Sequence, residues 1–140
     1  MTGTLPIGLI GIGLLGSALA KRLLASGDRV LGFDTNADQL AALSALGGGA
    51  ADHAEEVVRS CHTLFLSLPT SNTVSSLLGQ LEPEFQPGQI VIDTTTGDPA
   101  QMVAIGRRLE RWGVLSNSRR GVSKWGLRRA SVARTGSCAS

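Results

Sequence analysis

The feature that most constrains the fold is a glycine pattern near the start of the chain, Gly11-x-Gly13-x-x-Gly16. An apolar run over residues 5–10 precedes it, and a segment with apolar residues at helical spacing follows it. A strand, a tight turn and a helix in this order predict the first unit of a parallel α/β sheet. In such a unit Gly11 permits the turn, Gly13 lets a pyrophosphate approach the backbone, and Gly16 allows close helix packing. The pattern therefore predicts a dinucleotide site with phosphates at the helix N-terminus.

A carboxylate stands where such a site needs one. Residues 29–33 have the character of a second buried strand, and Asp34 ends it. At this spacing an acid can accept hydrogen bonds from the adenosine ribose hydroxyls; the alternative is a turn residue. It also repels a 2′-phosphate, because like charges about 4 Å apart cost roughly 4 kcal/mol at an effective dielectric of about 20. No Lys or Arg lies between Asp34 and Arg59 to attract that phosphate. NAD is therefore favoured over NADP.

A secretion signal is the alternative interpretation of the apolar N-terminus, because residues 5–20 end in Ala-Leu-Ala. No Lys or Arg precedes Lys21, so the basic start of a signal is missing. The glycines would also weaken its helix. The run is shorter than the roughly 20 residues that cross a membrane. We therefore expect neither a signal nor a membrane span.

The length and composition predict one globular domain. A chain of 140 residues with 42% hydrophobic content can bury roughly two-thirds of its unfolded surface. Its two cysteines, Cys61 and Cys138, lie far apart and outside any metal-binding spacing, which indicates free thiols and a cytoplasmic location. The two histidines, His53 and His62, have no further cluster of ligands, so no metal site is predicted.

Beyond Asp34 the chain alternates between predicted helices and strands. Strands are expected over residues 63–68 and 89–93. Helices are expected after side-chain caps, which we assign to Asn36, Asp52, Ser71 or Asn72, and Asp98. The alternation predicts an α/β fold with a doubly wound parallel sheet of the Rossmann type. Ligands of this fold lie outside the carboxyl ends of the strands. Those ends are residues 11–16, 34, 68–71 and 93–96.

These four strand ends resemble the nucleotide-binding domain of the β-hydroxyacid dehydrogenases, the family of 3-hydroxyisobutyrate dehydrogenase, tartronate semialdehyde reductase and 6-phosphogluconate dehydrogenase. The family opens with G-x-I-G-x-G-x-M-G, which corresponds to residues 8–16 with Leu15 in place of Met. Its NAD-using members have an acid like Asp34. Its Leu-Pro loop corresponds to Leu68-Pro69, and its I-D-x-S/T-T-x-x-P segment to residues 92–99. The match covers residues 5 to about 113.

The resemblance implies an NAD-dependent oxidoreductase that, in its full-length relatives, acts on a small hydroxy acid. It implies that Thr96 reaches the nicotinamide and that Thr95 lies at the substrate, although both could also be solvated hydroxyls at a strand end. Asn72 lies one residue before the position of an asparagine in the family. With the glycine turn, the predicted cofactor-binding residues are Gly11, Ile12, Gly13, Leu14, Leu15, Gly16, Asp34, Leu68, Pro69, Asn72 and Thr96.

The resemblance stops after Gly113. The family continues with a strand, a glycine-rich substrate loop and an all-helical domain that supplies a catalytic lysine, and none of these is recognisable here. Lys124 does not fit the lysine helix, so no catalytic residue is assigned. We expect residues 1–114 to form the dinucleotide-binding domain, truncated before the all-helical domain. Such a domain would bind NAD without turnover on its own.

The charge balance changes abruptly near the end of the chain. Residues 1–110 hold six Lys or Arg and all eleven acids, whereas residues 111–140 hold seven Lys or Arg and no acid. Only Val114 and Leu115 are apolar before a polar, basic run begins. We therefore expect residues 115–140 to be a basic tail outside the fold, either disordered or translated out of frame.

Two other functions fit the same residues. A stand-alone NAD-binding or redox-sensing module could use the basic tail to bind an acidic partner. Nucleic acid is not the expected partner, because Trp112, Trp125 and scattered arginines form no known recognition motif. A pyrroline-carboxylate or imine reductase also opens with this glycine turn, but residues 92–96 favour the hydroxyacid dehydrogenases.

Overall fold

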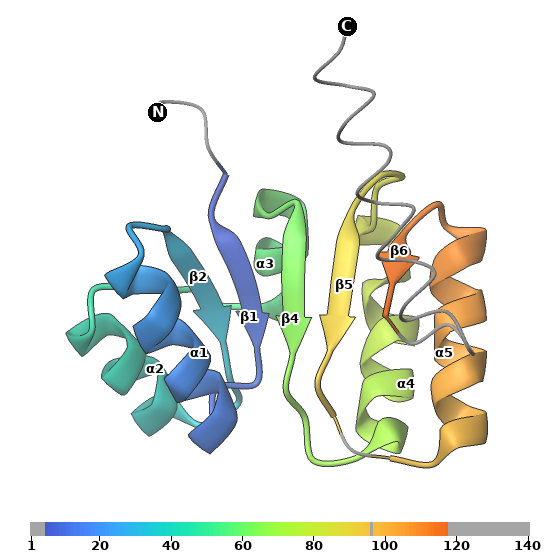
Figure 1. Ribbon diagram of the computed structural model, residues 1–140, viewed down its shortest axis with the longest axis horizontal. Coiled ribbons are helices and arrows are strands. Elements are labelled where there is room, and N and C mark those ends of the chain that lie inside the picture. Colours follow the sequence, from blue (N-terminus) through green and yellow to red (C-terminus); the bar gives the residue numbers. More distant parts are fainter. Residues whose placement is uncertain (1–4, 96, 118–140) are drawn as a thin grey trace, which may run out of the picture.

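The computed structural model describes residues 5–95 and 97–117. These residues form a six-stranded sheet with the strand order β3-β2-β1-β4-β5-β6 (Figure 1). Every neighbouring pair is parallel. This order confirms the predicted doubly wound, Rossmann-type fold. The strands are β1 (Ile7–Ile10), β2 (Val30–Phe33), β3 (Gly49–Ala50), β4 (Thr63–Leu66), β5 (Ile90–Asp93) and β6 (Leu115–Ser116).

Helices connect the strands as the alternation predicts. In Figure 1, α1 and α2 lie beside the β1–β2 half of the sheet, and α4 and α5 lie at the β5–β6 end. Helices α1 and α2 pack in one apolar cluster and α3, α4 and α5 in another, so the two groups cover opposite faces of the sheet. The helices are α1 (Leu14–Ala25), α2 (Ala37–Ala45), α3 (Ala54–Ser60), α4 (Ser71–Leu81) and α5 (Pro99–Arg111), with a short 3₁₀ helix η1 (Glu82–Glu84).

Each face of the sheet buries its own apolar cluster. Leu9 and Val30 pack with Leu43 of α2 and with residues of α1 in the smaller cluster. Ile10 belongs to the larger cluster, together with strand residues such as Leu64 and with α3, α4 and α5. Consecutive residues of β1 enter different clusters because side chains alternate along a strand. This two-sided burial explains why the strands read as almost continuous apolar runs.

Two of the predicted helix caps are confirmed. The Asn36 side chain accepts a hydrogen bond from the Asp38 N–H at 2.9 Å. The Asp98 side chain accepts one from the Gln101 N–H at 3.0 Å, and Pro99 occupies the first position of α5. Both caps satisfy an N–H group that has no partner within its helix.

The other two caps differ from the prediction. Helix α3 begins after His53, one residue later than the Asp52 cap requires, and His53 makes no side-chain cap bond. Helix α4 is capped by Thr70, whose side chain accepts a hydrogen bond from the Thr73 N–H at 3.1 Å. Ser71 does not cap α4 because its side chain is buried and bonded to Gln101.

The sheet extends past the domain boundary that the sequence predicts at residue 114. Leu115 pairs with Ile90, and its N–H donates to the Gln89 carbonyl at 2.9 Å. The positive φ of Gly113, 77°, turns the chain from α5 into this short edge strand. A strand of two residues has too little apolar pattern to recognise in a sequence. Residues 118–140, the remainder of the predicted tail, lie outside the described residues.

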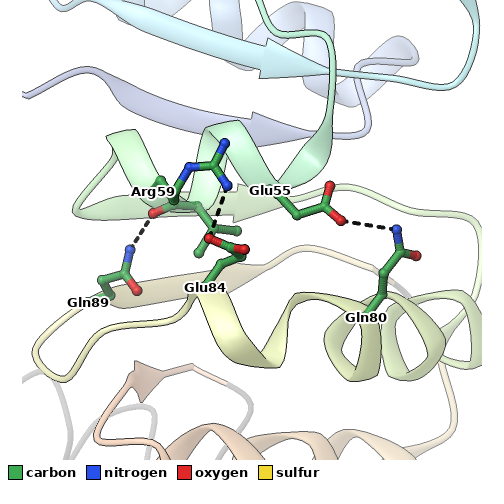
Figure 2. Close-up of polar contacts among 6 residues, drawn as sticks. Glu55, Arg59, Gln80, Glu84 and Gln89 are labelled. Atoms are coloured by element: carbon green, nitrogen blue, oxygen red, sulfur yellow. Dashed lines mark hydrogen bonds and ion pairs between the residues drawn. The ribbon is translucent and has the colours of Figure 1, made fainter.

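Polar contacts join α3 to the segment that runs from α4 to β5 (Figure 2). Arg59 and Glu84 form an ion pair at 3.1 Å, and Gln80 donates to Glu55 at 3.4 Å. Gln89 is the buried member of this group. Its amide nitrogen donates to the carbonyls of Val58 and Cys61, at 2.7 and 2.8 Å, and its amide oxygen accepts from the Gln86 N–H at 2.7 Å. One side chain thus supplies hydrogen-bond partners to backbone groups at the end of α3 and in the turn before β5.

We expect Gln89→Leu to lower the free energy of unfolding by about 1–3 kcal/mol, because it leaves buried carbonyl groups unpaired. Gln80→Leu is the matched control, since Gln80 is exposed and makes one long contact. It should change stability by no more than about 0.5 kcal/mol. Urea unfolding of both variants measures the difference, and equal effects would contradict the role assigned to Gln89.

Candidate dinucleotide-binding site

The strand order creates a switch point between β1 and β4. From β1 the chain proceeds outward to β2 and β3, and it then crosses the sheet to β4 on the other side of β1 (Figure 1). Because all strands are parallel, their carboxyl ends meet at one edge. The crevice above β1 and β4 is the place where a doubly wound sheet binds its ligand.

The glycine turn brings two backbones into close contact at this edge. Gly11 has a positive φ of 91°, and a Cβ atom there would lie 2.1 Å from the Ser67 carbonyl oxygen. A Cβ atom on Gly16 would lie 2.5 Å from the Gly11 carbonyl oxygen, so α1 packs directly on the turn. A Cβ atom on Gly13 would meet nothing within 4 Å. Gly11 and Gly16 therefore serve the turn and the packing, and Gly13 leaves open space above the backbone.

Helix α1 presents a free N-terminus beside this space. Gly13 stands at its cap without a side-chain hydrogen bond, and the first turn contains no acid. The first N–H groups of a helix have no partner within it, and together with the helix dipole they attract an anion. Leu14 is 93% exposed and Leu15 48% exposed at the same end. Two large apolar side chains therefore flank an anion-attracting helix end.

Asp34 links the end of β2 to the glycine turn. Its Oδ2 accepts a hydrogen bond from the Ile12 N–H at 2.8 Å, and its Oδ1 accepts one from the Asn36 N–H at 2.8 Å. Each carboxylate oxygen has a second acceptor site, so these bonds leave room for ribose hydroxyls. The bond to Ile12 orders the loop that the phosphates would approach. The strand pattern predicts the acid at this edge, but its hydrogen bond to the glycine turn depends on the fold.

The loops after β4 and β5 are joined by threonine hydroxyls. The Leu68 N–H donates to Thr95 Oγ1 at 3.1 Å, and Thr94 Oγ1 donates to the Leu66 carbonyl at 2.8 Å. Thr95 is only 7% exposed, so its hydroxyl faces the protein rather than open solvent. Pro69 follows Leu68 at the surface of this loop. Thr96, the predicted nicotinamide contact, lies outside the described residues.

Asn72 lies in a polar cluster between the first turns of α4 and α5. It is exposed, and its Oδ1 accepts a hydrogen bond from Gln101 Nε2 at 2.8 Å. The same glutamine bonds to the buried hydroxyl of Ser71. A Cβ atom on Gly97 would lie 2.7 Å from the Ser71 side chain, so the loop before α5 packs against this cluster. The sequence does not single out Gln101, because it is a surface residue in the first turn of a helix.

Asp93 is a buried acid at the carboxyl end of β5, with 5% of its surface exposed. Its Oδ1 accepts a hydrogen bond from the Thr95 N–H at 2.8 Å. Burial raises the pKa of the Asp93 carboxyl, and hydrogen bonds from Thr95 oppose that rise. Asn117 bonds both backbone groups of Asp93, at 2.8 and 3.0 Å. Sequence analysis assigns no role to Asn117, because β6 is needed to bring it here.

Other reactive groups lie away from this edge. Burial raises the pKa of the Cys61 thiol to about 11, so the thiol stays protonated at neutral pH and is a poor nucleophile. Within residues 5–95 and 97–117, no group of three or more His, Cys, Asp or Glu could hold a metal ion. No helix of this part of the chain is long and apolar enough to cross a membrane.

The switch point, the glycine turn and the acid after β2 define a dinucleotide-binding domain of the Rossmann type. Residues 6–123 match the family model for the NAD binding domain of 6-phosphogluconate dehydrogenase. The chain belongs to this family. The match confirms the relationship to the 3-hydroxyisobutyrate and 6-phosphogluconate dehydrogenases that the sequence motifs predict.

Curated relatives and solved structures agree with this assignment. The chain is 32% identical to a probable 3-hydroxyisobutyrate dehydrogenase-like 2 protein of Arabidopsis thaliana, over 77% of this chain and 38% of the relative. The 3-hydroxyisobutyrate dehydrogenase of Mycobacterium tuberculosis has a TM-score of 0.77 at 23% identity, over 81% of this chain and 39% of that chain.

Imine reductases share the fold as well. The Myxococcus stipitatus enzyme, solved with NADP⁺, has a TM-score of 0.74 at 24% identity, over 79% of this chain and 39% of that chain. A variant of it is solved with NAD⁺. At this identity the likeness concerns the fold alone, and the choice between the two cofactors depends on the side chains of the site. The chain spans about 40% of the length of these relatives.

Gly11→Ala tests the close approach at the switch point. Gly27 is the matched control, since it has the same φ of 91° but open space around its Cβ position. Gly27→Ala should cost about 1–2 kcal/mol of backbone strain. Gly11→Ala adds a clash with the Ser67 backbone and should cost roughly 2 kcal/mol more. Urea unfolding measures both, and equal losses would mean that β1 and β4 separate freely at this point.

Proposed function

We propose that this domain binds NAD across the β1–β4 switch point and forms the cofactor half of a dehydrogenase for a small 3-hydroxy acid. The observation that carries the proposal is the Asp34 carboxylate, which stands at the end of β2 and hydrogen-bonds to the glycine turn through the Ile12 N–H. One acid thereby orders the phosphate loop and faces the position of the adenosine ribose.

The pyrophosphate is proposed to lie over Gly13 and the N-terminus of α1. The open space at Gly13 and the absence of an acid in the first helical turn support this position. The exposed side chains of Leu14 and Leu15 would contact the bound cofactor. Leu68, Pro69 and Asn72 would line its nicotinamide half, with Thr96 near the ring and Thr95 at the side of the substrate.

NAD is the proposed cofactor rather than NADP. The negative charge of Asp34 repels a 2′-phosphate, and no Lys or Arg lies between Asp34 and Arg59 to attract one. The Asn36 N–H, which could otherwise face an anion, donates to Asp34 itself. A reducing cytoplasm is the proposed compartment, a view that the free, buried thiol of Cys61 supports.

The substrate class is proposed from the relatives, whose names describe 3-hydroxyisobutyrate dehydrogenases. Hydride transfer requires a substrate held against the nicotinamide and a proton donor within reach. The loops after β4 and β5, residues 67–70 and 94–98, contain neither Lys nor His. The proposed role of this domain is therefore to bind and orient the cofactor, while the rest of the substrate site and the proton donor come from outside residues 5–117.

Asp34→Ala should weaken NADH binding about tenfold or more, because it removes the ribose acceptors and the bond to Ile12. Asp34→Asn, which removes the charge but keeps an amide oxygen, should narrow the preference for NADH over NADPH. Asp38→Asn is the control, since it removes an exposed charge in the first turn of α2. Calorimetric titration measures each affinity. Equal binding of NADH and NADPH by the unmodified chain would contradict the role of Asp34.

The unmodified chain should bind NADH but not catalyse turnover. NAD and 3-hydroxyisobutyrate, incubated with the purified chain, should give no steady rise in NADH absorbance, because the loops after β4 and β5 offer no Lys or His to accept the proton of the substrate hydroxyl. A bound cofactor with no product is the expected pair of results. Steady NADH production by a preparation free of other dehydrogenases would contradict this division of roles.

A further inference from the structure

A chain of hydrogen bonds runs from β5 to the loop after β4, and the proposed function does not account for it. Asp93 Oδ1 accepts a hydrogen bond from the Thr95 N–H at 2.8 Å. Thr95 Oγ1 in turn accepts one from the Leu68 N–H at 3.1 Å. Asn117 holds Asp93 from the other side through both of its backbone groups. Three segments that are distant in sequence are thereby joined at one edge of the sheet.

Burial makes this arrangement costly for a purely structural link. Asp93 is 5% exposed, and its Oδ2 has no hydrogen-bond partner in the part of the chain that the structure describes. A buried carboxylate oxygen without a partner lowers stability relative to an apolar side chain of the same shape. The acid therefore calls for a reason beyond the stability of β5.

The place of the loop supplies that reason. If Asp34 binds the adenosine ribose beside β2, an extended dinucleotide crosses the switch point and its other half lies above β4 and β5. Leu68 and Pro69 begin the loop that leaves β4 at this point. Pro69 has no N–H group, so it cannot anchor the loop by its own backbone donor. Among the described residues, the Leu68 N–H has one hydrogen-bond partner, the hydroxyl of Thr95.

We propose that Asp93 is a positioning residue for the nicotinamide half of the cofactor, acting through Thr95 on the Leu68-Pro69 loop. The carboxylate fixes the Thr95 backbone, and the Thr95 hydroxyl then holds Leu68 in a binding conformation. The proposal rests on the proposed function, because it assumes that a dinucleotide occupies the crevice. In this proposal Asp93 and Thr95 affect binding of the nicotinamide half of the cofactor and leave binding of the adenosine half unchanged.

The experiment compares two ligands that share the adenosine half, NADH and ADP-ribose. Thr95→Val removes the hydroxyl and keeps the shape, and it should weaken NADH about tenfold while changing ADP-ribose less than about twofold. Thr95→Ser, which keeps the oxygen, should restore NADH binding. Thr94→Val is the control, since it removes a hydroxyl bond from the same strand end to the Leu66 carbonyl but not to the loop. It should leave the ratio of the two affinities unchanged.

Asp93 is tested in the same titrations. Asp93→Ala should reproduce the selective loss of NADH affinity. Asp93→Asn keeps an acceptor for the Thr95 N–H and should therefore retain most of the NADH affinity. The double variant Asp93→Ala/Thr95→Val should lose no more NADH affinity than the single variant that binds NADH less tightly, because the two residues act in series. Circular dichroism verifies that each variant is folded. If Asp93→Ala does not fold, the Asp93→Asn and Thr95 variants still decide the question.

Hydrogen exchange tests the bond to the Leu68 amide without any ligand, and the two affinities separate the positioning role from the proposed function. In the free chain, Thr95→Val should speed exchange of the Leu68 amide at least tenfold, and Thr94→Val should not. An unmodified chain that binds ADP-ribose and NADH equally, or a Thr95→Val variant that loses both ligands alike, would overturn the positioning role and leave cofactor binding intact. An unmodified chain that binds neither ligand would overturn the proposed function, and the positioning role with it.

Discussion

The close approach of β1 and β4 at Gly11 governs the arrangement of this domain. A side chain at Gly11 would overlap the Ser67 carbonyl oxygen, and the turn also requires the left-handed backbone that glycine adopts without strain. With the turn in place, α1 starts directly above the switch point and packs on it through Gly16. The position of the helix end, and hence of its free N–H groups, follows from this contact.

Acids at the ends of two strands hydrogen-bond to the loops of the proposed cofactor site. Asp34, after β2, hydrogen-bonds to the glycine turn, and Asp93, at the end of β5, hydrogen-bonds to the Thr95 N–H. Both acids therefore accept from backbone N–H groups, Asp34 from a neighbouring loop and Asp93 from the loop that follows it. They differ in environment, because Asp34 is partly exposed and can still meet a ligand, whereas Asp93 is buried and reaches the crevice only through its neighbours.

Much of the fold could be predicted because its signals are local. The apolar runs of β1 and β4, the glycine turn and the Asp98-Pro99 start of α5 each depend on a few consecutive residues. The misplaced caps of α3 and α4 show the limit of such signals. Ser71 is as good a cap as Thr70 by residue type, but packing against Gln101 draws it inward. No local pattern reports that packing.

The sequence by itself determined the four longer strands, the helices between them, the glycine turn and the acid after β2, because each is set by residue type and spacing. Only the tertiary structure decided that β3 and β6 join the sheet, since a strand of two residues depends on the backbone of its neighbour, β2 or β5, for its hydrogen bonds. The same is true of the bonds among Asn117, Asp93, Thr95 and Leu68. These side chains lie up to several elements apart in the chain, and parallel strand ends bring them together only after the sheet has formed.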